Sequence, residues 1–358
     1  MLNLVSDCFD KKKAELVSKY ITDKSIKRGI FGINSYADSI ADNIEIDFFV
    51  DDYRKEREYR GKPLIKTEEI PENSMLISVV VLGRNWTAMN KLIEKNIEAI
   101  DYFAFEKYSG LNIKKVNVFC ECKEDIEENR IKYEEIYNKL GDEESKETFL
   151  NILNFRLSGN MEYLKRFKFR QEEQYFEEFL KFGTEEVFVD AGGFEGETAL
   201  EFIKKCKNYK EIHIFEPDPS NLAKAKLNLE KYNNVYFYEK GVSNKKEVLK
   251  FGAGDGSASK ISDQGNIIIN VDSIDNMINE KITFVKMDIE GAEEEAIKGM
   301  KNHIINDCPK MAICIYHKKD DFWRIPETIF KIRKDYKIYV RHYNEGITET
   351  VMYFIPKK

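Results

Sequence analysis

The glycine-rich segment VDAGGFEGETA at 189–199 constrains the fold more than any other part of the chain. An apolar run ends at Asp190, three glycines follow by position 196, and a helical pattern begins near Glu197. Glycine is needed where the backbone reverses tightly or where a ligand approaches it closely. The free N–H groups of the following helix then point toward that ligand. The segment therefore predicts a strand, a turn and a helix that together bind a small molecule.

The C-terminal half alternates between apolar runs and helical patterns. Strands are expected at 186–190, 211–216, 235–240, 284–288 and 310–316, followed by two strands joined by the NEG turn at 344–346. This pattern predicts an α/β fold with a doubly wound seven-stranded sheet and a terminal antiparallel hairpin, as in class I methyltransferases. A dinucleotide dehydrogenase domain would more often continue with parallel strands.

The N-terminal part predicts a second, smaller α/β domain. Strands and helices alternate over 25–110, and helical spacing continues over 120–182. The expected organisation is a Rossmann-like domain at 1–115, a helical connector at 116–182 and a methyltransferase domain at 183–358. The first segment is similar to nucleotide-binding Rossmann modules of sugar-modifying enzymes, but only Gly32 and Asp51 match the usual pattern. A scaffold, or a module that forms a homo-oligomer, is favoured over a nucleotide site.

Composition narrows the classes of function. The net charge of −7 over 358 residues argues against a nucleic-acid binder. Six cysteines without a CxxC pair and four histidines make a structural zinc site or a disulfide scaffold improbable. The N-terminus has no signal-type pattern, and no apolar run is long enough to span a membrane. A cytoplasmic protein with reduced thiols is expected.

The glycine turn predicts a methyl-donor site. A carboxylate at Asp190 would repel a pyrophosphate, whereas it could offset the ammonium or sulfonium of S-adenosylmethionine. Glu216 lies at the end of the second strand, where an acid accepts hydrogen bonds from ribose hydroxyls. In the loop at 251–259, Ser257 and Ser259 could contact cofactor or substrate. The predicted cofactor-binding residues are Asp190, Gly192, Gly193, Gly196, Thr198, Glu216, Pro217, Gly241, Val242 and Asp288.

A second group of polar residues follows the fourth and fifth strands of this domain. Asp288 and Glu290 come after the fourth, and His317 follows the fifth. A hydroxyl is a poor nucleophile, so a base helps methyl transfer, and histidine suits neutral pH. His317 is the candidate base, with Asp288 or Glu290 orienting it. These three residues and Asp320 could also ligate a divalent ion, but nothing in their spacing demands one, so no metal is expected.

The motifs VDAGGFEGETAL, IFEPDPSN, KMDIEGAEEEAIKG and YHKKDDFWRIP resemble the FkbM methyltransferase family in order and spacing, over about 170–356. The resemblance implies O-methylation that depends on S-adenosylmethionine. The implied acceptor is often a sugar of a surface polysaccharide, or a hydroxyl or carboxyl of a natural product. It places cofactor roles on Asp190, Gly192, Gly196 and Glu216 and reaction roles on Asp288, Glu290 and His317. Gly193 departs from the usual pattern, which affects only the local backbone.

These observations predict an S-adenosylmethionine-dependent O-methyltransferase that modifies a sugar or glycan hydroxyl, as in polysaccharide biosynthesis. Two alternatives stay open at this point. One is a nucleotide-dependent sugar-modifying enzyme or oxidoreductase that uses a Rossmann site. The other is a module that binds the donor without catalysis.

Overall fold

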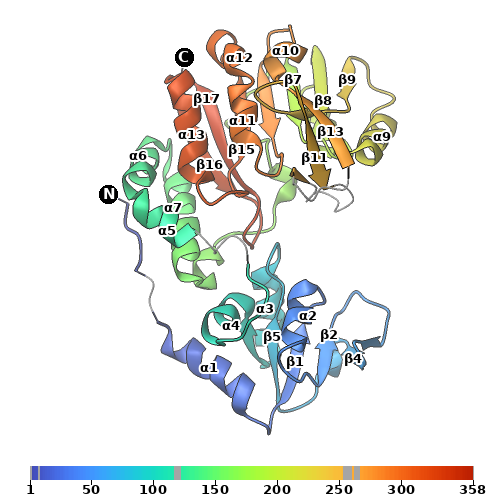
Figure 1. Ribbon diagram of the computed structural model, residues 1–358, viewed down its shortest axis with the longest axis vertical. Helices are drawn as coiled ribbons and strands as arrows, with labels where there is room; N and C mark the ends of the chain where they lie inside the picture. Colours follow the sequence, from blue (N-terminus) through green and yellow to red (C-terminus); the bar gives the residue numbers. More distant parts are fainter. Residues whose placement is uncertain (1, 7–8, 117–121, 253–259, 262–266, 358) are drawn as a thin grey trace. The chain divides into compact units, whose positions relative to one another are not determined.

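The computed structural model describes residues 2–6, 9–116, 122–252, 260–261 and 267–357. The chain divides into two compact units. The first unit comprises Met1–Arg130, Glu147–Gln171 and His342–Thr348, and the second comprises Ile131–Lys146, Glu172–Arg341 and Glu349–Lys358. Each unit contains a largely parallel sheet of its own (Figure 1). The segment at 116–182 contributes residues to both units.

The first unit is built on a six-stranded sheet in the order β3-β4-β2-β1-β5-β6. All neighbouring strands are parallel except β3 and β4. This arrangement confirms the expected Rossmann-like alternation. The KPLI stretch at 62–65 forms strand β4, in which Leu64 is buried beside β2. The elements are α1 (Lys11–Thr22), β1 (Lys27–Phe31), α2 (Ser35–Ala41), β2 (Phe48–Val50), β3 (Glu58–Tyr59), β4 (Lys62–Ile65), β5 (Ser74–Ser78), α3 (Asn85–Glu94), β6 (Glu98–Asp101), α4 (Tyr102–Tyr108) and α5 (Cys122–Glu128).

A short segment from near the end of the chain completes the first unit. The carboxylate of Glu345 accepts hydrogen bonds from the backbone N–H and the hydroxyl of Thr87, both at 2.7 Å. The Asn344 amide donates to the carbonyl of Leu82 at 3.0 Å. These bonds hold the 342–348 segment to the loop and helix that follow β5.

The second unit is built on a seven-stranded sheet in the order β16-β17-β15-β14-β7-β8-β9 (Figure 1). Strands β7, β8, β9, β14 and β15 are parallel, β17 runs antiparallel to β15, and β16 lies at the edge. The predicted five parallel strands and terminal hairpin are therefore confirmed. The strand order reverses between β7 and β14, which is where open α/β sheets bind ligands. The strands are β7 (Val187–Ala191), β8 (Glu211–Phe215), β9 (Val235–Tyr238), β14 (Phe284–Met287), β15 (Lys310–Cys314), β16 (Tyr336–His342) and β17 (Thr350–Pro356).

A second, four-stranded sheet follows β9 in the order β10-β13-β11-β12. The sequence did not predict it, because glycines and serines dominate the middle of this region. The alternation of IIINVD at 267–272, with Ile269 and Val271 buried and Ile268 exposed, is the signal of a half-buried strand. Ser257 and Ser259 lie outside the described residues. The strands are β10 (Gly241–Val242), β11 (Glu247–Gly252), β12 (Lys260–Ile261) and β13 (Ile267–Asp272).

Helices and buried aromatic rings complete the second unit. The rings of Phe188, Phe202 and Phe284 pack with centroids 4.5–6.1 Å apart. Among the described residues, no helix is both long and apolar enough to cross a membrane. The helices are α6 (Arg130–Lys139), α7 (Glu143–Ser158, shared with the first unit), α8 (Glu197–Lys205), α9 (Pro219–Asn228), α10 (Ile274–Met277), α11 (Glu293–Lys298), α12 (Lys301–Asn306) and α13 (Asp321–Ile332).

Candidate active site

The glycine turn after β7 requires its glycines. Gly192 and Gly196 have φ of 78° and 90°, in the left-handed region that side chains disfavour. A Cβ atom on Gly192 would lie 1.9 Å from the carbonyl oxygen of Asp288, and one on Gly193 would lie 2.3 Å from Ile214. Gly196 is the N-cap of α8. The turn therefore packs directly against the end of β14, on the side where the strand order reverses.

Lys286 is a central residue of this region that sequence reasoning missed. It lies in β14 directly beside Asp190 of β7, and its Nζ lies 3.1 Å from Asp190 Oδ1. Asp190 is fully buried and Lys286 is 3% exposed. Nζ also donates to the carbonyl oxygen of Gly192 at 2.6 Å. The sequence did contain a signal for this residue: a lysine lies inside an otherwise apolar strand, and a buried lysine needs a buried partner of opposite charge.

This ion pair changes the interpretation of Asp190. Burial raises the pKa of the Asp190 carboxyl, and the charge of Lys286 opposes that rise. Burial lowers the pKa of Lys286, but the charges of Asp190 and Asp288 outweigh it and raise the pKa overall. Asp190 thus already has a cationic partner within the protein, and any charge it offers to a ligand is shared with Lys286.

Glu216 directly follows β8 and contacts the glycine turn. One carboxylate oxygen accepts from the backbone N–H of Phe194 and the other from that of Asp218, both at 2.9 Å. Burial, opposed by these two hydrogen bonds, raises the pKa of Glu216 to about 7. The predicted ribose-binding acid therefore joins the turn and the start of α9, where Asp218 caps the helix.

The other predicted cofactor residues are spread along the same unit. Thr198 lies half-buried in the first turn of α8, and Pro217 follows Glu216. Gly241 and Val242 form β10, so they belong to the four-stranded sheet and not to the sheet that carries the glycine turn. Their predicted role in binding the cofactor stays a prediction.

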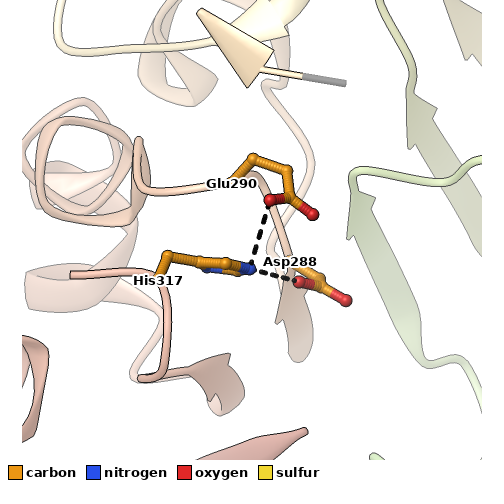
Figure 2. Close-up of side chains that lie close together, drawn as sticks. All are labelled: Asp288, Glu290 and His317. Atoms are coloured by element: carbon orange, nitrogen blue, oxygen red, sulfur yellow. Dashed lines mark ion pairs between the residues drawn. The ribbon is translucent and has the colours of Figure 1, made fainter. Parts of the chain in front are cut away.

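The structure brings the three predicted reaction residues together (Figure 2). Asp288 and Glu290 follow β14, His317 follows β15, and both carboxylates point toward one ring nitrogen of the histidine. Nε2 of His317 lies 3.3 Å from Asp288 Oδ1 and 3.8 Å from Glu290 Oε2. The His317 side chain is only 6% exposed, compared with 23% for Asp288 and 25% for Glu290. We refer to Asp288, Glu290 and His317 as the carboxylate–histidine cluster.

A fourth residue, Glu293 of α11, fixes the histidine ring. Its fully buried carboxylate lies 2.9 Å from Nδ1 of His317 and accepts the backbone N–H of Ile289 at 3.0 Å. Burial opposes the charge on His317, but Glu293 and Asp288 outweigh burial and hold the ring pKa well above its usual value. Sequence analysis assigned no role to Glu293, which is the first of three consecutive glutamates at the start of this helix.

Two tyrosines hold Asp288 in place. The hydroxyl of Tyr175 donates to Oδ2 at 2.8 Å, and that of Tyr316 donates to Oδ1 at 3.2 Å. Burial opposes ionisation of Asp288, but His317, Lys286 and Tyr175 outweigh burial and lower its pKa. Tyr175 comes from a segment without regular structure more than a hundred residues earlier, so no local sequence pattern indicated that it contacts Asp288.

Two carboxyls, Glu290 of the cluster and Glu349 outside it, have a raised pKa. Burial raises the pKa of Glu290 to about 7, and burial also raises that of Glu349 to about 7. Glu290 has a φ of 54°, a strained backbone conformation for a residue with a side chain. Asp320, which the sequence offered as a fourth metal ligand, pairs instead with Arg324.

Comparisons with known proteins agree with this architecture. The sequence model of the methyltransferase FkbM domain matches residues 189–340. The crystal structure of methyltransferase FkbM from Methylobacillus flagellatus KT matches 97% of this chain and 94% of that chain, with 23% identity and a TM-score of 0.77. That likeness shows a shared fold along nearly the whole chain.

Weaker likenesses extend to other methyltransferases. An rRNA methylase from Streptococcus thermophilus matches 48% of this chain and 87% of that chain, at 16% identity and a TM-score of 0.33. Aeropyrum pernix fibrillarin, solved with natively bound S-adenosyl-L-methionine, matches 48% of this chain and 67% of that chain, at 11% identity and a TM-score of 0.34. Scores this low support no inference, and no curated protein matches the sequence. Residues 189–340, which match the model of the methyltransferase FkbM domain, include both the glycine turn and the carboxylate–histidine cluster.

Proposed function

We propose that this protein is an S-adenosylmethionine-dependent O-methyltransferase that modifies a hydroxyl of a sugar or glycan. One observation carries the proposal: the glycine turn and the carboxylate–histidine cluster share one backbone junction. The N–H of Asp288 donates to the carbonyl of Ala191 at 3.1 Å, and Gly192 packs on the Asp288 carbonyl without room for a methyl group. A donor bound at the turn is therefore close to the side chains of the cluster, which can accept or donate a proton.

The donor side uses the turn, α8 and Glu216. The unpaired N–H groups at the start of α8 suit the carboxylate of the donor's methionine moiety. Each Glu216 oxygen keeps a second lone pair beyond its bond to the backbone, so the carboxylate can still accept ribose hydroxyls. Lys286 holds the carbonyl of Gly192 and so fixes the turn before the donor binds.

The acceptor side uses the cluster. In the proposed reaction an acceptor hydroxyl oxygen attacks the methyl carbon, and the carbon–sulfur bond breaks with its electrons going to sulfur. The hydroxyl proton passes to Nε2 of His317, which is therefore the proposed base. The ring must first lose the proton that its neighbouring carboxylates favour, and the positive sulfonium beside the cluster promotes that loss. Asp288 and Glu293 orient the ring on opposite sides.

A donor-binding experiment tests the first half of the proposal. Calorimetry with S-adenosylhomocysteine should show binding to the full chain, and Glu216→Ala should weaken it by about 1–3 kcal/mol, because a charged acceptor is lost. Lys298→Met, a change on the surface of the same unit, is the matched control. Binding of NAD in place of S-adenosylhomocysteine would refute the donor assignment and favour an oxidoreductase.

Transfer of a labelled methyl group tests the second half. The acceptor panel contains sugars and oligosaccharides with free hydroxyls, together with carboxylic acids as the competing class. His317→Gln should lower turnover by about 100-fold or more while leaving S-adenosylhomocysteine affinity unchanged. Equal turnover in His317→Gln and the parent would exclude His317 as the base, and transfer to carboxylic acids alone would exclude a hydroxyl acceptor.

A further inference from the structure

We propose that Asp288, Glu290 and His317 bind a divalent metal cation. One ligand atom from each residue lies within 4.8 Å of the other two. Two ligand atoms bound to one cation at about 2.1–2.2 Å are about 3.0–3.6 Å apart. The observed separations of 3.3 Å and 3.8 Å from Nε2 to the two carboxylate oxygens are close to this range. A cation could therefore be held after small side-chain rotations (Figure 2).

The histidine ring is prepared as a ligand. Nε2 is buried and makes no hydrogen bond, although a carboxylate oxygen of Asp288 lies only 3.3 Å away. The other ring nitrogen, Nδ1, is 2.9 Å from the fully buried carboxylate of Glu293. A proton on Nδ1, shared with that carboxylate, leaves a lone pair on Nε2 that is aimed between Asp288 and Glu290. Metal-binding histidines are usually oriented by a carboxylate in this way.

The two carboxylate ligands are also positioned in advance. The hydroxyls of Tyr175 and Tyr316 hold Asp288, and the left-handed backbone of Glu290 turns its side chain toward the ring. Such strain persists only where the surrounding structure imposes it, and it is concentrated at functional sites. The tyrosines fix one ligand: Tyr175 bonds Oδ2, and Tyr316 bonds Oδ1, the oxygen nearest to Nε2, which keeps a second lone pair for a cation.

Charge supports the same conclusion. The carboxylates of Asp288, Glu290 and Glu293 surround one imidazole ring, so even a protonated ring leaves the group negative. Lys286, the nearest buried cation, is already paired with Asp190. Partly or fully buried carboxylates that outnumber their cationic partners are costly, and a divalent cation would compensate their charge. One imidazole and two carboxylates form a mixed nitrogen and oxygen ligand set that suits Mn²⁺ among the common divalent ions.

The metal site deepens the proposed function. Cation binding itself does not depend on methyl transfer, and only the role of the cation in the reaction rests on the proposed function. Three protein ligands leave coordination positions open, and a cation there would polarise an acceptor hydroxyl and make it more acidic. The cation and a proton compete for Nε2. In the cation-bound protein His317 is therefore a ligand, whereas in the cation-free protein it is the proposed base.

Binding of Mn²⁺ to the chelator-treated full chain tests the site. Electron paramagnetic resonance should show about one bound Mn²⁺ per chain, and electron spin echo modulation should show coupling to an imidazole nitrogen. His317→Gln should abolish the nitrogen coupling, and Asp288→Asn and Glu290→Gln should each weaken binding at least about tenfold. Glu294→Gln is the matched control, because this carboxylate lies on α11 but pairs with Lys298 outside the cluster.

Circular dichroism verifies that each variant is folded, and affinity for S-adenosylhomocysteine, measured on the same samples, keeps the two proposals separate. Specific Mn²⁺ binding without S-adenosylhomocysteine binding would support the metal site and refute the donor site. Absence of Mn²⁺, Mg²⁺ and Zn²⁺ binding in a chain that binds S-adenosylhomocysteine would overturn the metal site. Mn²⁺ binding that lacks nitrogen coupling and survives His317→Gln would overturn it as well.

Discussion

Replacing Lys286 with methionine should strongly destabilise the second unit. The change removes the cation but leaves Asp190, which is fully buried, between two neighbouring strands. Breaking a buried ion pair from one side costs about 3–5 kcal/mol. The lost hydrogen bond to the carbonyl of Gly192, 2.6 Å long, is part of the same cost. We expect a loss of about 4 kcal/mol at pH 7 and a smaller loss at low pH, since a protonated Asp190 needs no cation.

The double variant Asp190→Asn, Lys286→Met separates the pair from simple loss of packing. It removes both charges, so it should be at least about 2 kcal/mol more stable than Lys286→Met alone. Lys298→Met is the control, because its ion pairs are on the surface and such pairs contribute about 1 kcal/mol or less.

Urea unfolding followed by tryptophan fluorescence is the assay. The chain has two tryptophans, Trp86 in the first unit and Trp323 in the second. A Trp86→Phe background leaves Trp323, which is 3% exposed, as the only reporter of the second unit. The reasoning is refuted if Lys286→Met lies within about 1 kcal/mol of the parent, or if the double variant is no more stable than the single one.

Three further outcomes are expected. Burial raises the pKa of Glu216 to about 7, so affinity for S-adenosylhomocysteine should fall as pH drops from 8 to 6, and calorimetry of Glu216→Gln should show weaker binding without this dependence. Burial lowers the pKa of His342 to about 3. The unfolded histidine takes up a proton near pH 6.5 and the folded one does not, so the first unit should lose stability from pH 6.5 downward, at up to about 1.4 kcal/mol per pH unit. Unfolding with Trp86 as the only tryptophan checks this, and His342→Asn should flatten the dependence. Gly192→Ala should abolish donor binding, because its Cβ would lie 1.9 Å from a backbone oxygen, whereas Gly83→Ala, with open space around it, should leave binding unchanged in the same calorimetric assay.

The sequence predicted those site residues that can be recognised from their immediate neighbours in the chain. The glycine turn, Glu216 and the acids after β14 each follow an apolar strand, and strand ends in a parallel sheet meet at one edge. His317 was found for the same reason. The seven-stranded sheet followed from the alternation of strands and helices, together with the short turn between the last two strands.

The other site residues come together only through contacts between segments that are far apart in the sequence, and a local sequence pattern does not show such contacts. Lys286 and Asp190 become neighbours only through the register of β14 against β7. Tyr175 reaches Asp288 from an irregular segment 113 residues earlier. Glu293 looks like its partly exposed neighbours Glu294 and Glu295 in sequence, and only the orientation of the helix buries it. These residues support the predicted ones, so their roles follow from tertiary packing and not from spacing.

The interleaving of the two units has a consequence for how the chain is made. Residues 342–348 complete the first unit, yet a ribosome reaches them only after most of the second unit has emerged. At roughly 5–20 residues per second, the stretch from 130 to 348 takes about 10–40 s to synthesise. During that time Thr87 and Leu82 lack the hydrogen bonds that they make with Glu345 and Asn344 in the folded protein. The first unit therefore cannot complete its fold until residues 342–348 have been synthesised, by which time most of the second unit is already available to fold.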